Sequence, residues 1–154
     1  NGIQAMDLVM RKIPLADGAV VGAYLDEMQT NADQLQATGN GLATLGEALS
    51  TGIAGLRQTT DWLLASADPN DNLAGATPYL RQFGIVAGGY YLGRSALVAE
   101  QLLSTNGDDP WLRAKIDTCV FYGDQILPQA VGSAPAVTVG ANQLFAIDAD
   151  MLGQ

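Results

Sequence analysis

The sequence is organised around residues 77–106, TPYLRQFGIVAGGYYLGRSALVAEQLLSTN. Thr77 as the N-cap and Pro78 at the first helical position predict that a helix starts here. No charged residue lies between Arg81 and Arg94. This uncharged run is shorter than the roughly 20 apolar residues that a membrane-spanning helix needs. A helix that is apolar on every side is normally surrounded by other helices, so we expect this one at the centre of a bundle.

A short helix is expected at the start of the chain. Ile3, Met6, Met10 and Ile13 recur at spacings of three and four residues, which predicts one apolar stripe. Pro14 ends the pattern. Isolated helices of fewer than roughly 12 residues are marginal in water, so this helix needs a partner, and that partner need not belong to this chain.

The remaining apolar residues predict further helices on both sides of the central one. The expected elements are a linker at 14–18, helices at 19–37 and 42–67, a breaker at 38–41, a polar loop at 68–72, one long helix at 110–140 kinked at Pro128 and Pro135, and a short turn at 142–147 followed by a frayed tail. Glycines inside the helices, such as Gly46, Gly52, Gly84, Gly88 and Gly89, predict close helix contacts. The fold class expected is all-α: an antiparallel four-helix up-and-down bundle with a short extra N-terminal helix.

Composition excludes several classes of protein. With 48% hydrophobic and 15% charged residues in 154, the chain can build a core and is not a disordered segment. A net charge of −9 disfavours binding to nucleic acids and to anionic lipid surfaces. The single cysteine, Cys119, permits no internal disulfide, so we expect a reducing, cytoplasmic compartment. Because residue 1 is Asn and the helical pattern starts at once, we expect a piece cut from a longer chain in preference to a processed product.

No self-contained catalytic site is predicted. The chain has no histidine, which removes the histidine-dependent triads and metal sites. Cys119 lies on an apolar stripe, where a thiol is an inert small hydrophobe. Gly88–Ser95 nearly fits the phosphate-loop pattern with Arg94 in place of lysine, but the pattern needs a strand before it and a helix start within it. Here it lies inside a helix, so we interpret its glycines as packing positions.

Three other groups of residues are interpreted as structural. Aromatic residues expected as core or interface anchors, rather than as the lining of a pocket, are Tyr90, Tyr91, Trp111, Phe121 and Tyr122. Arg81 and Arg94 could hold an anion, although pairing with carboxylates is the better expectation. The acidic residues Asp68, Asp71, Asp108 and Asp109 lack the ligand order of a calcium loop and are expected as caps, so no metal is predicted.

Parts of the sequence resemble a known family. NGIQAMDLVMRK at 1–12 is similar to the segment that follows the Tyr-Glu-Gly-Thr motif of flavin-dependent acyl-CoA dehydrogenases. YLRQFGIVAGGYYLGRSAL at 79–97 and FYGDQILPQAVGSAPAVTVGA at 121–141 look like the extra C-terminal helical domain of the long members of that family. The resemblance implies that residues 1–13 are the last helix of the dehydrogenase core. It also implies that residues 14–154 are an accessory four-helix domain.

The resemblance also implies a function for the whole enzyme. Members of the family remove the α-proton of an acyl-CoA thioester with a glutamate, transfer the β-hydride to FAD and pass electrons to an electron-transferring flavoprotein. That glutamate belongs to the motif expected directly before Asn1, so the catalytic base would be missing from this chain. Asn1 and Gly2 match positions that lie against the FAD. Expected partners are the rest of the dehydrogenase and a neighbouring subunit of a homo-oligomer.

A second hypothesis stays open at this point. The chain could be a free-standing helical binding or adaptor protein with no catalytic activity. The dehydrogenase hypothesis predicts that the isolated chain neither binds FAD nor dehydrogenates acyl-CoA. The sequence that precedes Asn1 distinguishes them: the Tyr-Glu-Gly-Thr motif indicates the dehydrogenase, and an initiator methionine or a signal peptide favours the adaptor.

Overall fold

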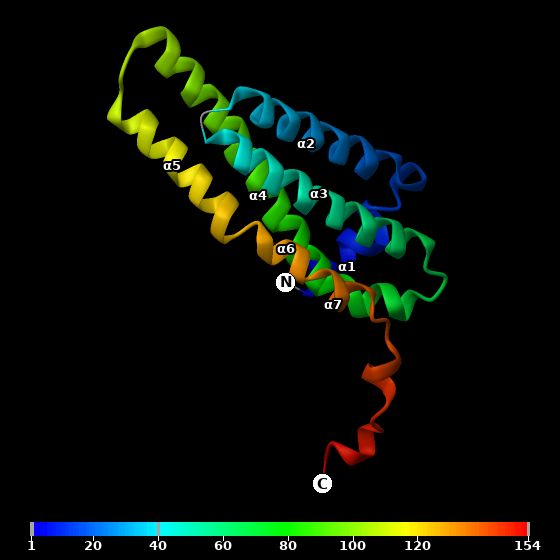
Figure 1. The fold of residues 1–154 in the computed structure, drawn as a ribbon. Helices are drawn as coiled ribbons and strands as arrows, with labels where there is room; N and C mark the ends of the chain where they lie inside the picture. Colours follow the sequence, from blue (N-terminus) through cyan, green and yellow to red (C-terminus); the bar gives the residue numbers. More distant parts are fainter. Residues whose placement is uncertain (1, 40, 154) are drawn as a thin grey trace.

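A computed structural model describes residues 2–39 and 41–153, and it confirms the all-α fold. Its four long helices are α2 (Ala19–Thr38), α3 (Leu42–Ala65), α4 (Pro69–Asn106) and α5 (Pro110–Gln125). Short loops join them, and Figure 1 shows successive helices side by side and running in opposite directions. The described residues contain no strand.

Short elements flank the four long helices. They are α1 (Gly2–Asp7), the π-helical η1 (Leu8–Lys12), the 3-10 turn η2 (Leu15–Gly18), α6 (Pro128–Gly132), α7 (Ala134–Thr138), and the 3-10 turns η3 (Asn142–Phe145) and η4 (Ala149–Met151). α6 and α7 pack on α3 and α4, as α5 does, so together they continue the fourth helix of the bundle after α5 ends. The expectation of one helix over 110–140 is therefore corrected to three shorter helices. Pro128 and Pro135 each lie in the first turn of a new helix, because a proline cannot donate the backbone bond that would continue the old one.

The central helix begins earlier than Thr77. Asp68 is the true N-cap, since its carboxylate accepts a hydrogen bond from the Asn70 amide at 2.8 Å, and Pro69 occupies the first turn. The loop expected at 68–72 is therefore corrected: Asp68 is the N-cap, and residues 69–72 form the first turn of α4. Pro78 lies inside the helix and does not start it. Both prolines follow a capping residue, so the sequence offered two equivalent starts. The interior proline costs one backbone bond, and burial of neighbours such as Tyr79 offsets that cost.

The N-terminal helix buries a different side from the one expected. Ala5, Val9 and Ile13 are buried, while Ile3 and Met6 are exposed. The chain changes to π-helical winding at Leu8, where the Ile13 amide donates to the Leu8 carbonyl at 3.0 Å. One extra residue per turn rotates the following side chains, which is why Ile13 is buried although Ile3 and Met6 are not.

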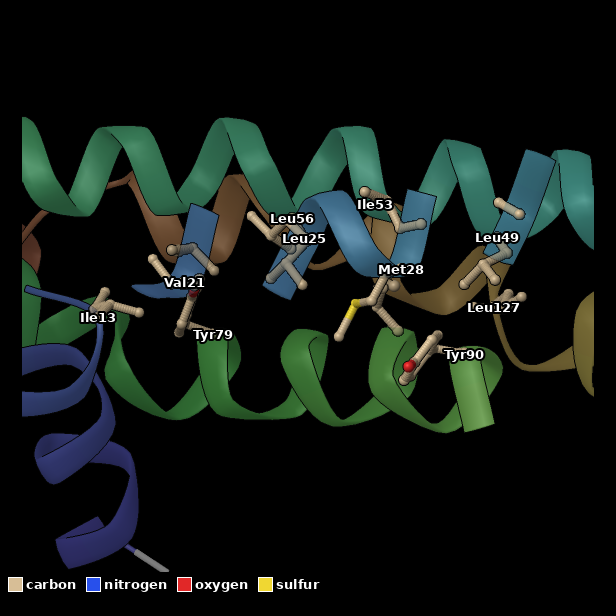
Figure 2. Close-up of a cluster of buried hydrophobic side chains, with 14 of the residues drawn as sticks. Ile13, Val21, Leu25, Met28, Leu49, Ile53, Leu56, Tyr79, Tyr90 and Leu127 are labelled. Atoms are coloured by element: carbon tan, nitrogen blue, oxygen red, sulfur yellow. The ribbon is translucent and has the colours of Figure 1, made fainter. Parts of the chain in front are cut away.

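The core lies between α2, α3 and α4 and is closed by the chain after α5. Figure 2 shows side chains from these helices pointing toward one another. The expected stripe of α2 is confirmed as buried, and its residues are Val21, Leu25, Met28, Ala32 and Leu35. The stripe of α3 is confirmed for Leu42, Leu45, Leu49, Ile53, Leu56 and Leu63, whereas Leu64 is partly exposed. The breaker expected at 38–41 joins α2 to α3: Thr38 ends α2, Gly39 and Gly41 have positive φ angles of 70° and 83°, and Asn40 lies outside the described residues.

Glycines of α3 and α4 receive large side chains from other helices. A Cβ atom on Gly89 would lie 2.8 Å from Leu127 Cδ2, and one on Gly52 would lie 3.6 Å from the same atom. Gly93 faces Leu35 in the same way, at 2.8 Å, and Gly88 faces the Tyr122 hydroxyl. These glycines therefore form the holes into which neighbouring helices pack. Gly84 was expected to do the same, which is wrong, because a Cβ there meets nothing within 4 Å.

The chain after α7 is fixed at one point and then leaves the bundle. Gly140 has the left-handed φ of 77°, and the Ala141 amide donates to the Asp71 carboxylate of α4 at 2.8 Å. Beyond this hydrogen bond the last residues extend away from the helices (Figure 1). The turn expected at 142–147 is confirmed as the 3-10 turn η3, and the tail from Asp148 that was expected to fray contains a second 3-10 turn, η4.

Candidate functional site

A polar and aromatic cluster links α2 to α4. The Tyr90 hydroxyl donates to Glu27 Oε1, and Arg94 Nη1 donates to the Tyr90 oxygen at 3.3 Å. The Arg94 guanidinium also lies 5.6 Å from the centroid of the Tyr90 ring, and Tyr24 meets that ring edge-on at 5.9 Å. The hydrogen bond to Glu27, together with burial, raises the pKa of Tyr90. A phenol with a raised pKa is no general base at neutral pH, so the cluster acts as a structural link.

The two arginines that flank the uncharged run were expected to pair with carboxylates. Both Arg81 and Arg94 are exposed, so neither is a buried charge that requires a carboxylate. Arg94 uses Tyr90 as its partner. Ion pairs between arginines and carboxylates occur instead at Arg11, Arg57 and Arg113.

Two buried polar pairs join α3 to α4. Thr59 donates to Gln82 Oε1 at 2.8 Å, and the hydroxyls of Thr60 and Tyr79 lie 2.7 Å apart. Burial raises the pKa of Tyr79 to about 12. The Gln82 amide nitrogen has no hydrogen-bond partner among the described residues, and it lies 3.7 Å from the position that a Cβ on Gly55 of α3 would take. Such pairs fix the register of the two helices and offer no chemistry.

Neither the candidate nucleophile, Cys119, nor the phosphate-loop-like segment Gly88–Ser95 forms a site. Cys119 is fully buried, and burial raises the pKa of its thiol more than Lys115 lowers it, so the thiolate needed for reactivity is disfavoured. Gly88–Ser95 lies in the middle of α4, where the backbone N–H groups are used by the helix. It therefore cannot cradle a phosphate.

The acidic residues expected as caps are distributed between capping and pairing. Asp68 and Asp109 are N-caps, each accepting from a backbone amide two residues later at 2.8 Å. The Asp71 carboxylate accepts a hydrogen bond from the Ala141 amide, and Asp108 forms an ion pair with Arg113 at 2.5 Å. No group of three potential metal ligands occurs among the described residues.

Apolar side chains are exposed on the N-terminal segment. We call the set Ile3, Met6, Met10, Leu15 and Val20 the N-terminal face. A shallow apolar groove of about 220 Å³ adjoins it and is lined by side chains that include Leu8, Tyr24 and Phe83. Scattered exposed apolar residues are normal, but five large ones within the first 20 residues favour a contact surface.

A second groove lies between α4 and α5, near their joining loop. Its volume is about 470 Å³, and its lining includes Tyr91, Arg94, Val98, Leu102, Trp111 and Lys115. Tyr91 and Trp111 were expected as anchors, and both are exposed here. Phe121 is exposed too, whereas Tyr122 packs between α5 and α4 and donates to the Ile85 carbonyl at 2.9 Å. We call this the α4–α5 groove.

The two residues expected against FAD lie at the chain start. Asn1 lies outside the described residues. Gly2 begins α1, is exposed, and has open space around the position of a Cβ. Because glycine has no side chain, only its backbone could contact a ligand.

Sequence reasoning missed several residues of these surfaces. Glu27 and Gln82 gave no signal, because their partners are far away along the chain. The tail did carry a signal in the sequence: Leu144, Phe145 and Ile147 are large apolar residues in a segment too short for a core helix. The described helices include none long and apolar enough to cross a membrane.

Comparison with known proteins defines the family. Residues 24–148 match the family described as acetyl-CoA dehydrogenase C-terminal like, and the chain belongs to this family. The chain is also 33% identical over 147 residues to a 3-methylmercaptopropionyl-CoA dehydrogenase of Ruegeria pomeroyi. That alignment covers 94% of this chain and 25% of the relative, so the chain spans about a quarter of the relative's length.

Proposed function

We propose that this chain is the C-terminal helical domain of an FAD-dependent acyl-CoA dehydrogenase, and that its role is packing rather than catalysis. The family match over residues 24–148 is the observation that carries the proposal. The relative is named as a 3-methylmercaptopropionyl-CoA dehydrogenase, and its alignment covers 94% of this chain at 33% identity. The substrate class of the parent enzyme is then an acyl-CoA thioester.

The N-terminal face supports a domain boundary near Pro14. We propose that residues 1–13 complete the last helix of the dehydrogenase core and that residues 14–154 form the accessory bundle. Ile3 and Met6 present apolar surface that the bundle leaves uncovered, as expected if the core covers it. Directly after Pro14, Ala16 and Asp17 adopt left-handed backbone, and this tight turn redirects the chain into α2.

The flavin would be held mainly by the parent enzyme's other residues. When bound, FAD supplies hydride acceptance from the β-carbon of the substrate. Gly2, and Asn1 before it, would contribute at most an edge contact, through backbone in the case of Gly2. The catalytic base would lie in the Tyr-Glu-Gly-Thr motif directly upstream. Proposed partners are a neighbouring subunit and an electron-transferring flavoprotein, in the cytoplasm.

The isolated chain is expected to bind no FAD and to have no dehydrogenase activity, because a general base must lie within hydrogen-bond reach of the proton that it removes. The measurement is the flavin absorbance of the purified protein, with acyl-CoA-dependent reduction of an electron acceptor as the second readout. The control is the parent protein, which should be yellow and active. A stoichiometrically flavin-loaded chain of 154 residues would contradict the proposal, as would an initiator methionine directly before Asn1 in its reading frame.

A further inference from the structure

The C-terminal tail is an apolar and acidic segment without a partner in its own bundle. Its large side chains are at least half exposed, and they are Leu144, Phe145, Ile147, Met151 and Leu152. Its charged residues are Asp148 and Asp150, and it has no basic residue. Figure 1 shows this segment projecting away from the helices. A segment with this much exposed apolar surface marks a contact with another molecule.

The α4–α5 groove has the complementary chemistry. Trp111 and Tyr91 expose aromatic surface, and Val98 and Leu102 add aliphatic surface. The charged residues among its lining are Arg94 and Lys115, both basic, in a chain with a net charge of −9. Aromatic and arginine side chains are typical anchors of protein interfaces. The groove therefore fits an apolar segment that carries negative charge.

The first large apolar residues of the tail, Leu144 and Phe145, cannot reach the groove of their own chain. Ala141 is held at Asp71, near the start of α4. Val98 lies about 40 Å further along that helix at 1.5 Å per residue. Even fully extended, the segment from Ala141 to Phe145 spans only about 14 Å. The apolar anchors at Leu144 and Phe145 can therefore meet such a groove only on a second copy of the chain.

We propose that the tail of one chain docks in the α4–α5 groove of a second copy. Asp148 and Asp150 then face Arg94 and Lys115, while Phe145 packs against Trp111. A reciprocal exchange of two tails closes a two-fold dimer, which is the commonest closed assembly of identical chains. Two tails of about ten residues each, with their grooves, approach the roughly 20–30 residues per side of a standard interface. This specifies the homo-oligomer of the proposed function and rests on that part of it.

The first test measures the mass of the chain in solution by light scattering after gel filtration. The account predicts twice the 16.0 kDa of one chain at micromolar concentration. Phe145→Ser should weaken dimerisation roughly 30-fold, because a buried aromatic anchor is lost. It should leave the helical circular dichroism of the folded chain unchanged, since Phe145 is 70% exposed in the single chain and lies outside the bundle core. Ile3→Ser, which removes an exposed apolar side chain outside both surfaces, is the matched control and should remain dimeric.

The second test uses charge. Lys115→Glu opposes the tail carboxylates and should weaken the dimer at least about tenfold. Adding Asp148→Lys and Asp150→Lys to the same chain should restore it. If the unsubstituted chain of 154 residues is a monomer, the proposal is wrong. It is also wrong if the dimer survives Phe145→Ser, or if the exchanged charges fail to restore the dimer. None of these results changes the flavin absorbance, so the two proposals fail separately.

Discussion

Leu127→Ala is expected to lower the free energy of unfolding by about 2–5 kcal/mol, the range for a buried leucine truncated to alanine. Leu127 is 1% exposed and fills the space left by two glycines, Gly52 of α3 and Gly89 of α4. The side chain of Leu127, at the start of α6, is therefore enclosed by α3 and α4. Truncation would leave a cavity that neither helix can fill without moving its axis. Urea unfolding monitored by circular dichroism measures the change.

A second substitution shows whether the glycine holes cause this sensitivity. Gly89→Ala alone should destabilise the protein, because the new Cβ would lie 2.8 Å from Leu127 Cδ2. In the Leu127→Ala background the same change should stabilise it by about 1 kcal/mol, since alanine is the better helix former and the clash is gone. A double-mutant cycle with no coupling energy would mean that Leu127 does not occupy the Gly89 hole.

Gly46→Ala is the other large expected effect. A Cβ atom on Gly46 would lie 2.7 Å from the Ala32 carbonyl oxygen and 2.8 Å from the Gln36 amide nitrogen. Both atoms belong to the α2 backbone, so the two helices must separate, at a cost of about 1–3 kcal/mol. For a chain of this size, each kcal/mol corresponds to a change in melting temperature of roughly 2–4 °C.

Gly22→Ala is the matched control for that substitution. Gly22 lies inside α2, and a Cβ there meets nothing within 4 Å. The change should raise the free energy of unfolding by about 0.5–1 kcal/mol, because alanine loses less backbone entropy than glycine on folding. If Gly46→Ala and Gly22→Ala shift the melting temperature in the same direction, the close approach of α2 and α3 is wrong.

Local signals in the sequence carried most of the fold. The stripe from Val21 to Leu35 predicted α2 nearly to the residue, since its period and its glycine breaker agree. Helix starts were harder, because Asp68-Pro69 and Thr77-Pro78 are the same signal and only tertiary packing selects the first. The π-helical turn at Leu8 could not be read from spacing, because the sequence pattern of an α-helix still fits the segment.

The surfaces were less predictable than the helices. Trp111 and Tyr91 could be named as anchors from their residue type, but their shared groove depends on how α4 and α5 cross. Glu27 and Tyr90 are 63 residues apart, and no local pattern joins them. The family assignment came from short motifs instead, and the match over residues 24–148 confirms it.

Hydrogen exchange over residues 2–13 tests the central claim most directly, namely that the N-terminal face is covered by the dehydrogenase core. In the isolated chain, the amides of α1 should exchange quickly, because one side of this short helix is exposed to water. In the parent enzyme the same amides should exchange markedly more slowly, while those of α3 around Leu49 should be slow in both. Equal exchange rates at Gln4–Asp7 in the two proteins would contradict the account.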